Sequence, residues 1–333
     1  MEALVQCKAA VRRVIPHPLY ERGSIVYRKS LNWTRGLVFG FPDLILYFGA
    51  TPGDDLLCTV VLRELKKRSA QKIWMISNHS ELFVRNADVA KVVPEYDFFR
   101  YYPAFLGGKY QRLEYARYDS QEDRGVPTTG HVITELCARA GVTGEIALHP
   151  YFYLSSAEKE SAVWANRMIA IQSSGLASKF RMQNKEWYPE RFQEVVHRLK
   201  NDFKFVQIGS ANDPLLTDVL DLRGKTSIRE SAAILSQARL FVGLEGFTTH
   251  LARSVECPAV IVFGGRTAPW QFGYSCNINL YSDVPCAPCW LWNKCDYDRK
   301  CMNQIGAAAV VDGVLGMLQR PRNPLVVDTA RIQ

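Results

Sequence analysis

The stretch VGLEGFTTHLA, at residues 242–252, brings an acid, two glycines, two threonines and a histidine into one short segment. Its first residues are apolar, as in a buried strand, and its last residues can continue as a helix. Because backbone N–H groups at the start of a helix bind anions, the segment predicts a site for phosphate and ribose. The alternative is a capped turn in an ordinary α/β core, with a buried core histidine. The candidate binding residues are Glu245, Gly246, Phe247, Thr248, Thr249 and His250.

Four cysteines crowd into a second stretch, PCAPCWLWNKCDYDRKCM at residues 285–302, with the spacing C-x2-C-x5-C-x5-C. Four thiolates so close together suit a tetrahedral zinc or iron ion. Such a site would be structural, because four protein ligands leave no open position for catalysis. The alternative is a packed loop with reduced thiols. The candidate ligands are Cys286, Cys289, Cys295 and Cys301.

Length and composition favour a globular protein of two domains. The chain has 333 residues, of which 47% are hydrophobic and 22% charged. It contains no apolar run long enough to span a membrane, and its N-terminus lacks the apolar core of a signal peptide, so we expect a cytoplasmic protein. Five of the nine cysteines are scattered, unlike a secreted disulfide framework.

The formal net charge of +8 is concentrated near the N-terminus, where residues 1–40 hold seven Lys or Arg and two Glu. This segment indicates an anionic partner, such as a phosphorylated glycolipid, an anionic membrane surface or nucleic acid. The alternative is a solvated basic face that aids solubility. Nucleic acid is disfavoured, because the segment shows no recognisable nucleic-acid motif with interleaved aromatic residues.

Short apolar runs alternate with helical runs along the chain, which predicts parallel sheets with right-handed crossovers. Ser227 and Glu230 have the spacing of a capping box at a helix start. Residues 155–166 are small and polar and form the expected connector, whereas residues 98–130 are hard to assign. We expect strands at 44–48, 72–77, 146–155, 168–172, 204–210, 239–244 and 259–265, and helices at 56–68, 130–140, 188–200, 227–238 and 249–256.

The predicted fold class is α/β, with two doubly wound halves and a cleft between them. We expect an N-terminal acceptor-side domain at 1–158 with a basic leading segment at 1–43, a nucleotide-sugar domain at 159–316, and a tail at 317–333. The turns at 49–55 and 243–250 each leave the carboxyl end of a strand, where ligands bind in such folds. Both turns should therefore face the cleft.

Four segments in this order resemble family 9 glycosyltransferases, the group that contains the ADP-heptose lipopolysaccharide heptosyltransferases. They are GATPGDDLLCTVVLRELKK, IQSSGLASKFRMQNKEWYPERF, LRGKTSIRESAAILSQARLFVG and VGLEGFTTHLARSVECPAVIVFGG. The resemblance runs from about residue 44 to residue 305. It implies a GT-B type fold of two facing Rossmann-like domains and inverting transfer of a sugar from a nucleotide donor.

The resemblance implies that Asp54 is the catalytic base, because an inverting displacement needs a group that takes the proton of the acceptor hydroxyl. The alternative for Asp54 is a helix N-cap. Gly53 and Asp55 would lie on the acceptor side. Lys185 stands where the family places a cation on the donor diphosphate, which would stabilise the leaving phosphate without a metal. The small residues Ser173, Ser174 and Gly175 suit a close approach of backbone to phosphate.

The chain departs from the family at residues 245–247, where Glu-Gly-Phe stands in place of an Asp, a Ser or Thr, and a Gly. This departure leaves the sugar open more than the nucleotide site. The family also includes protein-heptosylating members that hold iron with four cysteines at a different spacing. The resemblance thus adds to the case for a structural metal.

These observations predict an inverting glycosyltransferase that moves a heptose-like sugar from a nucleotide donor such as ADP-heptose. The expected acceptor is a bacterial surface glycan or glycolipid, and the expected location is the cytoplasm or the inner face of the inner membrane. No cofactor is expected for catalysis. The alternatives are a protein glycosyltransferase of the same family and a sugar-nucleotide epimerase or hydrolase of the same fold.

Overall fold

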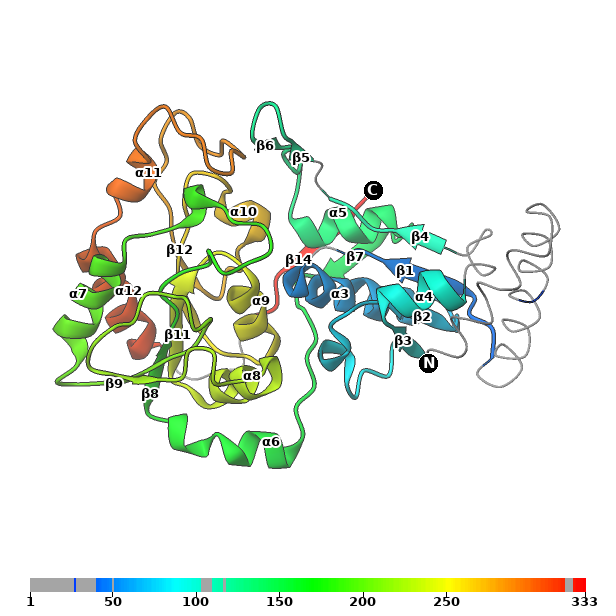
Figure 1. Cartoon of the computed structure of the whole chain (residues 1–333), viewed down its shortest axis with the longest axis horizontal. Coiled ribbons are helices and arrows are strands. Elements are labelled where there is room, and N and C mark those ends of the chain that lie inside the picture. The colour runs from blue at the N-terminus through cyan, green and yellow to red at the C-terminus, as the bar shows by residue number, and fades with distance from the viewer. Residues whose placement is uncertain (1–26, 28–39, 50, 103–109, 116–117, 321–325) are drawn as a thin grey trace, which may run out of the picture.

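The computed structural model describes residue 27 and residues 40–49, 51–102, 110–115, 118–320 and 326–333. The predicted basic leading segment at 1–43 lies almost entirely outside the described residues. Figure 1 shows two α/β domains beside one another, with α6 (Ser156–Ser161) in the connection between them. No helix in the described part of the chain has the length and apolar character needed to cross a membrane.

The N-terminal domain is built on a parallel sheet with the strand order β3-β2-β1-β4. One face of the sheet packs under α3 and α5, and the other face packs against Phe98 and Tyr102 at α4. The elements are β1 (Leu44–Tyr47), α3 (Pro52–Arg68), β2 (Ile73–Ile76), the 3-10 helix η1 (Ser80–Phe83), β3 (Lys91–Val93), α4 (Glu95–Tyr101), β4 (Tyr110–Arg112), β5 (Tyr118–Asp119), β6 (Arg124–Gly125), α5 (Val132–Arg139) and β7 (Gly144–Ala147).

The C-terminal domain is built on a six-stranded parallel sheet with the order β10-β9-β8-β11-β12-β13. Side chains alternate along its strands, so that one face packs against α7 and α12 and the other against α8 and α9. The elements are η3 (Val163–Ala165), β8 (Met168–Ile171), η4 (Gln183–Lys185), α7 (Pro189–Leu199), β9 (Lys204–Gln207), β10 (Val219–Asp221), α8 (Ile228–Gln237), β11 (Leu240–Leu244), α9 (Phe247–Ser254), β12 (Ala259–Val262), α10 (Pro269–Phe272), β13 (Ile278–Leu280), α11 (Lys300–Asn303) and α12 (Ala307–Gln319).

Helix α3 begins earlier than the sequence analysis expected. The predicted turn at 50–55 is replaced by a helix that starts at Pro52, with Thr51 as its N-cap. Proline suits the first turn because its missing N–H would be unpaired there in any case. Asp54 completes a capping box with Thr51, and Gly53 and Asp55 therefore lie in the first helical turn. The capping box predicted for Ser227 and Glu230 is confirmed at the start of α8.

The strand predicted at 146–155 is wrong beyond Ala147. Pro150 has no backbone N–H to donate to a neighbouring strand, and the N–H of Tyr151 donates to the side-chain oxygen Oγ1 of Thr59. The strand β7 pairs antiparallel with β14 (Thr329–Ile332), which lies within the predicted C-terminal tail. The end of the chain thus returns to the N-terminal domain, although α12 belongs to the other one (Figure 1).

The two domains contact each other along several elements. Helix α3 packs against α9, and apolar side chains of both helices, such as Leu57 and Leu251, join one buried cluster. At the connection, the guanidinium of Arg229 on α8 donates to Glu158 of α6 at 2.5 Å and to the carbonyl oxygen of Glu81 at 2.9 Å. These contacts hold the two domains at a fixed spacing.

Candidate active site

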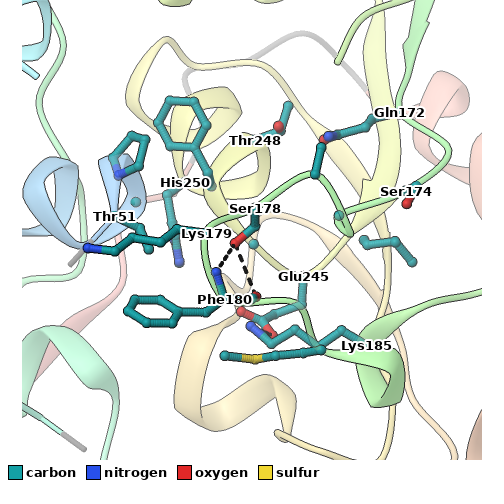
Figure 2. A pocket seen from close by; sticks show the side chains of 18 of the residues that line it. Thr51, Gln172, Ser174, Ser178, Lys179, Phe180, Lys185, Glu245, Thr248 and His250 are labelled. Carbon is teal, nitrogen blue, oxygen red and sulfur yellow. Dashed lines mark hydrogen bonds and ion pairs between the residues drawn. The ribbon is translucent and has the colours of Figure 1, made fainter. Parts of the chain in front are cut away.

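A pocket of about 400 Å³ lies between the domains, at the carboxyl ends of strands from both sheets. Its wall on the N-terminal side comes from the first turn of α3 and from Tyr115, and its other wall comes from the loops after β8 and β11. Figure 2 shows Thr51 on one side of the pocket and Gln172 and Ser174 on the other. This position agrees with the ligand-binding edge of doubly wound sheets.

Asp54 lines this pocket from α3, and its side chain is almost fully buried. Thr51 Oγ1 donates to Asp54 Oδ2 at 2.6 Å, and the Tyr115 hydroxyl donates to Asp54 Oδ1 at 2.8 Å. Burial raises the pKa of Asp54 above its ordinary value, although these two hydrogen bonds and the Lys185 ammonium act in the opposite direction. Oδ2 also accepts the N–H of Thr51 at 3.1 Å, whereas Oδ1 accepts, among the described residues, only the Tyr115 hydroxyl. Oδ2 therefore caps the helix, and Oδ1 keeps a lone pair that can receive a proton.

Lys185 and Glu245 form a buried ion pair on the opposite wall, with 2.7 Å between Nζ and Oε2. Figure 2 shows the two side chains next to each other in the pocket. Burial lowers the pKa of Lys185, and the neighbouring Glu245 carboxylate counteracts this effect. Burial alone would raise the pKa of Glu245, but the Lys185 ammonium and Arg266 bring it below its ordinary value. The pair places a cation where an anionic ligand can reach it.

The first turn of α9 faces the same pocket. Gly246 is its N-cap residue, and Gly246, Phe247, Thr248 and His250 all line the pocket. Gly246 offers no side-chain cap, so the first N–H groups of α9 have no side-chain hydrogen-bond partner at this position. The partial positive charge of a helix start and the Lys185 ammonium therefore act on the same space. This arrangement can hold a phosphate group.

The remaining residues predicted to bind the nucleotide sugar differ in whether they line the pocket. Ser174 and Gly175 line the pocket. The N–H of Gly175 donates to Glu186 Oε1 at 2.8 Å, so it stabilises the loop and is already paired. Ser173 Oγ donates to the carbonyl oxygen of Pro214 at 2.7 Å, and Thr249 Oγ1 donates to that of Leu244 at 2.8 Å. Neither of these two hydroxyl groups is part of the pocket wall.

Gly53 lines the pocket, whereas Asp55 is buried beneath it and absent from its wall. Asp55 Oδ2 accepts a hydrogen bond from Ser77 Oγ at 2.5 Å and lies 2.8 Å from His79 Nδ1. The hydrogen bond from the Asp55 carboxylate raises the pKa of His79 above its ordinary value. The side-chain contacts of Asp55 therefore lie within the N-terminal domain, although Asp55 directly follows Asp54 in the sequence.

Sequence reasoning missed several residues that line the pocket. Tyr115 comes from the segment that gave no clear pattern, and Phe180 lies on the loop after β8 in Figure 2. Only their long-range contacts place them at the site, so no local pattern could have identified them. The other unpredicted lining residues with polar side chains are Thr51, Gln172, Ser178, Lys179, Glu186, Ser210 and Asp213.

The four clustered cysteines lie in a half-buried loop of the C-terminal domain. The N–H of Gly265 donates to Cys301 Sγ at 3.1 Å, and the N–H of Arg299 donates to Cys295 Sγ at 3.3 Å. Burial raises the pKa of Cys289 and of Cys301. Among the residues that the structure describes, no three His, Cys, Asp or Glu side chains are placed to hold a metal ion. The structure therefore does not confirm the predicted site at Cys286, Cys289, Cys295 and Cys301.

The β5–β6 hairpin of the N-terminal domain docks onto this cysteine loop. Asp123 Oδ2 accepts hydrogen bonds from the N–H groups of Asn293 and Lys294, at 2.6 and 2.7 Å. The ring of Tyr118 lies 4.0 Å from that of Trp292, which also contacts Phe180 of the pocket wall. The loop is thus linked to the pocket through an aromatic contact.

Residues 145–290 match the sequence model of the family described as Glycosyltransferase family 9 (heptosyltransferase). No curated protein matches the chain in sequence. Among solved structures, ADP-heptose LPS heptosyltransferase II of E. coli superposes with a TM-score of 0.61 at 15% identity, over 83% of this chain and 98% of that one. The iron-containing dodecameric glycosyltransferase TibC from enterotoxigenic E. coli H10407 gives 0.67 at 17% identity, over 84% and 77%.

A third similar structure is the family 9 glycosyl transferase from Veillonella parvula DSM 2008, with a TM-score of 0.61 at 13% identity, over 84% of this chain and 97% of that one. Together with the parallel sheets and the pocket between them, these likenesses define a GT-B fold of two facing Rossmann-like domains. The chain is a glycosyltransferase. Its residues 145–290 are a glycosyltransferase family 9 domain, so the predicted resemblance is confirmed.

Proposed function

We propose that the chain transfers a heptose-like sugar from a nucleotide donor such as ADP-heptose to an acceptor hydroxyl, with inversion at the anomeric carbon. The observation that carries the proposal is the position of Asp54, which faces the Lys185 and α9 side of the pocket from the other domain. One of the similar structures is TibC in complex with ADP-D-beta-D-heptose, which supports an ADP-linked donor. The departure at Glu245-Gly246-Phe247 bears on the identity of the sugar more than on the nucleotide site.

In this proposal the oxygen of the acceptor hydroxyl attacks the anomeric carbon, and the Asp54 carboxylate takes the proton from that hydroxyl as the new bond forms. The bond between that carbon and the phosphate oxygen breaks, and the nucleoside diphosphate leaves with the electron pair. Lys185 and the first turn of α9 stabilise the charge that develops on the leaving phosphate. Each of these groups lines the pocket.

The acceptor that we propose is a bacterial surface glycan or glycolipid, reached in the cytoplasm or at the inner face of the inner membrane. A protein acceptor is the second candidate, because the family that the chain resembles includes protein-heptosylating members with four cysteines, and this chain has a loop with four cysteines. A hydrolase of the same fold would transfer the sugar to water and release free sugar and nucleotide, and an epimerase would convert the donor into its epimer, in both cases without modifying an acceptor. Mass spectrometry of extracted glycolipid and of protein, each offered with a panel of donors, separates these outcomes.

The test of the catalytic proposal is Asp54→Asn. Asparagine keeps the size of the side chain and removes its basicity, so transfer should fall by at least about a hundredfold, as expected for loss of a general base. Affinity for ADP should change little, because Asp54 belongs to the wall opposite the proposed phosphate-binding groups, Lys185 and the first turn of α9. Normal turnover by this variant would remove Asp54 from the base role.

A metal is not part of this proposal, because the thiols as placed do not fit a metal site. The backbone N–H groups that donate to Cys301 and Cys295 can make these hydrogen bonds to reduced thiols without a metal. Elemental analysis of protein purified without added metal tests the loop independently. One zinc or iron per chain would restore the structural site predicted from the sequence.

A further inference from the structure

Tyr274, between α10 and β13, makes a buried contact with His250 of α9. The Tyr274 hydroxyl lies 2.7 Å from His250 Nδ1, and the two rings meet edge to face with 5.8 Å between their centroids. Tyr274 is 1% exposed and His250 is 3% exposed. No sequence pattern pointed to Tyr274, and it is not part of the pocket wall.

The direction of this hydrogen bond follows from counting donors and acceptors. The described residues give the Tyr274 hydroxyl no partner other than His250 Nδ1. If Nδ1 were the donor, the phenol proton would be buried without an acceptor, which costs roughly 1–3 kcal/mol. The phenol therefore donates to Nδ1, and the ring hydrogen of a neutral imidazole must then lie on Nε2.

The charge state of His250 agrees with this assignment. Burial lowers the pKa of His250 to about 3, so the ring is neutral at physiological pH. The carboxylate of Glu245 acts in the opposite direction, but it is already paired with Lys185 at 2.7 Å. Nε2 has no hydrogen-bond partner among the described residues, and the ring lines the pocket beside the first turn of α9 (Figure 2).

We propose that Tyr274 is a positioning residue that holds His250 as the Nε2–H tautomer, so that this N–H donates to a phosphate oxygen of the departing nucleoside diphosphate. The inference rests on the proposed function, because it assigns His250 a role in the same leaving-group site. A neutral donor suits this place, since an imidazolium would be attracted to Glu245 and would compete with Lys185 for it. The other tautomer would present a lone pair to the phosphate and repel it.

The N-terminal domain supports Tyr274 in this position. His131, the N-cap residue of α5, accepts the N–H of Ile133 at Nδ1, so its Nε2–H donates to the carbonyl oxygen of Gly273 at 3.1 Å. Burial lowers the pKa of His131 to about 4, which keeps the ring neutral. The backbone next to Tyr274 is thus held by a residue of the other domain.

The experiment combines a spectroscopic and a binding measurement on the full chain. Nitrogen-15 chemical shifts of histidine-labelled protein report the tautomer, with the His250 signals assigned by their loss in His250→Gln. We expect the Nε2–H form in the wild type and a mixture of tautomers in Tyr274→Phe. Affinity for ADP should fall about five- to tenfold in Tyr274→Phe, as expected for one weakened hydrogen bond to a charged group. Affinity for adenosine, which has no phosphate, should not change.

A pair of His250 variants makes the test sharper. The side-chain amide of glutamine can place an N–H near the position of Nε2, so His250→Gln should retain more ADP affinity than His250→Asn. Adding Tyr274→Phe to His250→Gln should have no further effect, because the amide has no tautomer to fix. Tyr47→Phe is the matched control, since Tyr47 is also buried and donates one hydrogen bond, to Glu95 at 2.6 Å. Its ADP affinity should equal that of the wild type.

Two results would overturn the inference: an Nδ1–H tautomer of His250 in the wild type, or wild-type affinity for ADP in folded Tyr274→Phe. The wild-type spectrum decides the first question even if Tyr274→Phe does not fold. A wild-type protein that binds no nucleoside diphosphate would contradict the proposed function instead, and the tautomer measurement would still decide the inference about Tyr274.

Discussion

The Tyr115 hydroxyl donates a hydrogen bond of 2.8 Å to Asp54 Oδ1 across 61 positions of sequence. This bond stabilises the ionised carboxylate and counteracts the effect of burial on its pKa. The ionised form of the base that we propose is therefore favoured by a residue whose importance is visible only in the folded chain. Its contribution can be measured directly.

Tyr115→Phe should move the acidic limb of the pH profile of kcat/KM to higher pH. The proposed base is active when ionised, so activity falls as the pH drops through the pKa of Asp54, and loss of a donor raises that pKa. A hydrogen bond to a charged group is worth roughly 1.5–3 kcal/mol, so we expect about a tenfold loss of activity on the acidic side and less at high pH. Tyr110→Phe is the control, since Tyr110 is half-buried and does not contact Asp54. An acidic limb that stays in place would show that this hydrogen bond does not tune the base.

Lys185→Met should destabilise the protein by about 3–5 kcal/mol near neutral pH, because it leaves Glu245 buried without its partner. In the wild type, the pKa of Glu245 lies below its ordinary value. The ion pair therefore stabilises the fold at pH values above the pKa that Glu245 has in the unfolded chain, and this contribution is lost as the pH falls through the pKa of Glu245 in the folded protein. In the variant, burial raises that pKa, so its stability should decrease as the pH rises above the ordinary carboxylate range. Urea unfolding at acidic and neutral pH measures both effects.

The double variant Lys185→Met with Glu245→Gln is the matched control for this ion pair. Removing both charges takes away the uncompensated carboxylate, so most of the lost stability should return. ADP affinity should remain low in both variants, because the ammonium group is absent in each. Recovery of ADP affinity in the double variant would show that Lys185 does not bind the diphosphate.

Much of the fold could be predicted from local patterns. The capping box of Ser227 and Glu230 is a pattern of four residues, and the structure reproduces it. The buried strands β8, β11 and β12 fall within the predicted runs, because an apolar run between turn residues specifies a strand by itself. The start of α3 was placed too late, since Thr51-Pro52-Gly53 resembles a turn as much as a first helical turn.

The site was most predictable where the residue type limits what a side chain can do. Lys185 and Asp54 carry charge, so their presence in a cleft follows from the family pattern, and both line the pocket. Hydroxyl groups are less constrained: Thr248 lines the pocket, whereas Thr249, one position further along α9, donates to the carbonyl oxygen of Leu244. Which of two adjacent threonines faces the pocket depends on the angle at which the helix packs.

Asp123→Ala should loosen the cysteine loop without changing the pocket residues themselves. The carboxylate accepts two backbone N–H groups, at 2.6 and 2.7 Å, and removing it leaves both unpaired. Loss of these hydrogen bonds should cost about 1–3 kcal/mol locally. Hydrogen–deuterium exchange should accelerate at residues 290–295, whereas exchange in β8 should not change. Equal exchange in the loop of variant and wild type would contradict a holding role for Asp123.

The same contact should depend on pH. The N–H donors of Lys294 and Asn293 hold the pKa of Asp123 below its ordinary value, although burial opposes them. A carboxyl group with a lowered folded pKa stabilises above its unfolded pKa, and the contribution is lost as the pH falls through the folded pKa. The protection of residues 290–295 should therefore decrease in acid in the wild type and be independent of pH in Asp123→Ala.

Asp55 and His79 lie beneath the proposed base and carry opposite charges when His79 is protonated. The Asp55 carboxylate raises the pKa of Asp54, and the hydrogen bond between Asp55 and His79 raises the pKa of His79. Because His79 is stabilised in its charged form, the pair stabilises the fold fully below the unfolded histidine pKa and loses this contribution as the pH rises through the folded pKa. The pair can therefore change the basicity of Asp54 without touching the pocket.

Substitutions of the two partners should move the acidic limb of the kcat/KM profile in opposite directions. Asp55→Asn removes a negative charge beside Asp54, so it should lower the pKa of Asp54 and move the limb to lower pH. His79→Gln removes the positive charge that balances Asp55, so the limb should move to higher pH. Ser77→Ala removes no charge, although Ser77 Oγ both donates to Asp55 Oδ2 and accepts the N–H of His79 at 2.9 Å, and it should have the smallest effect of the three. If Asp55→Asn and His79→Gln shift the limb in the same direction, the two side chains act on the local fold and not through their charges.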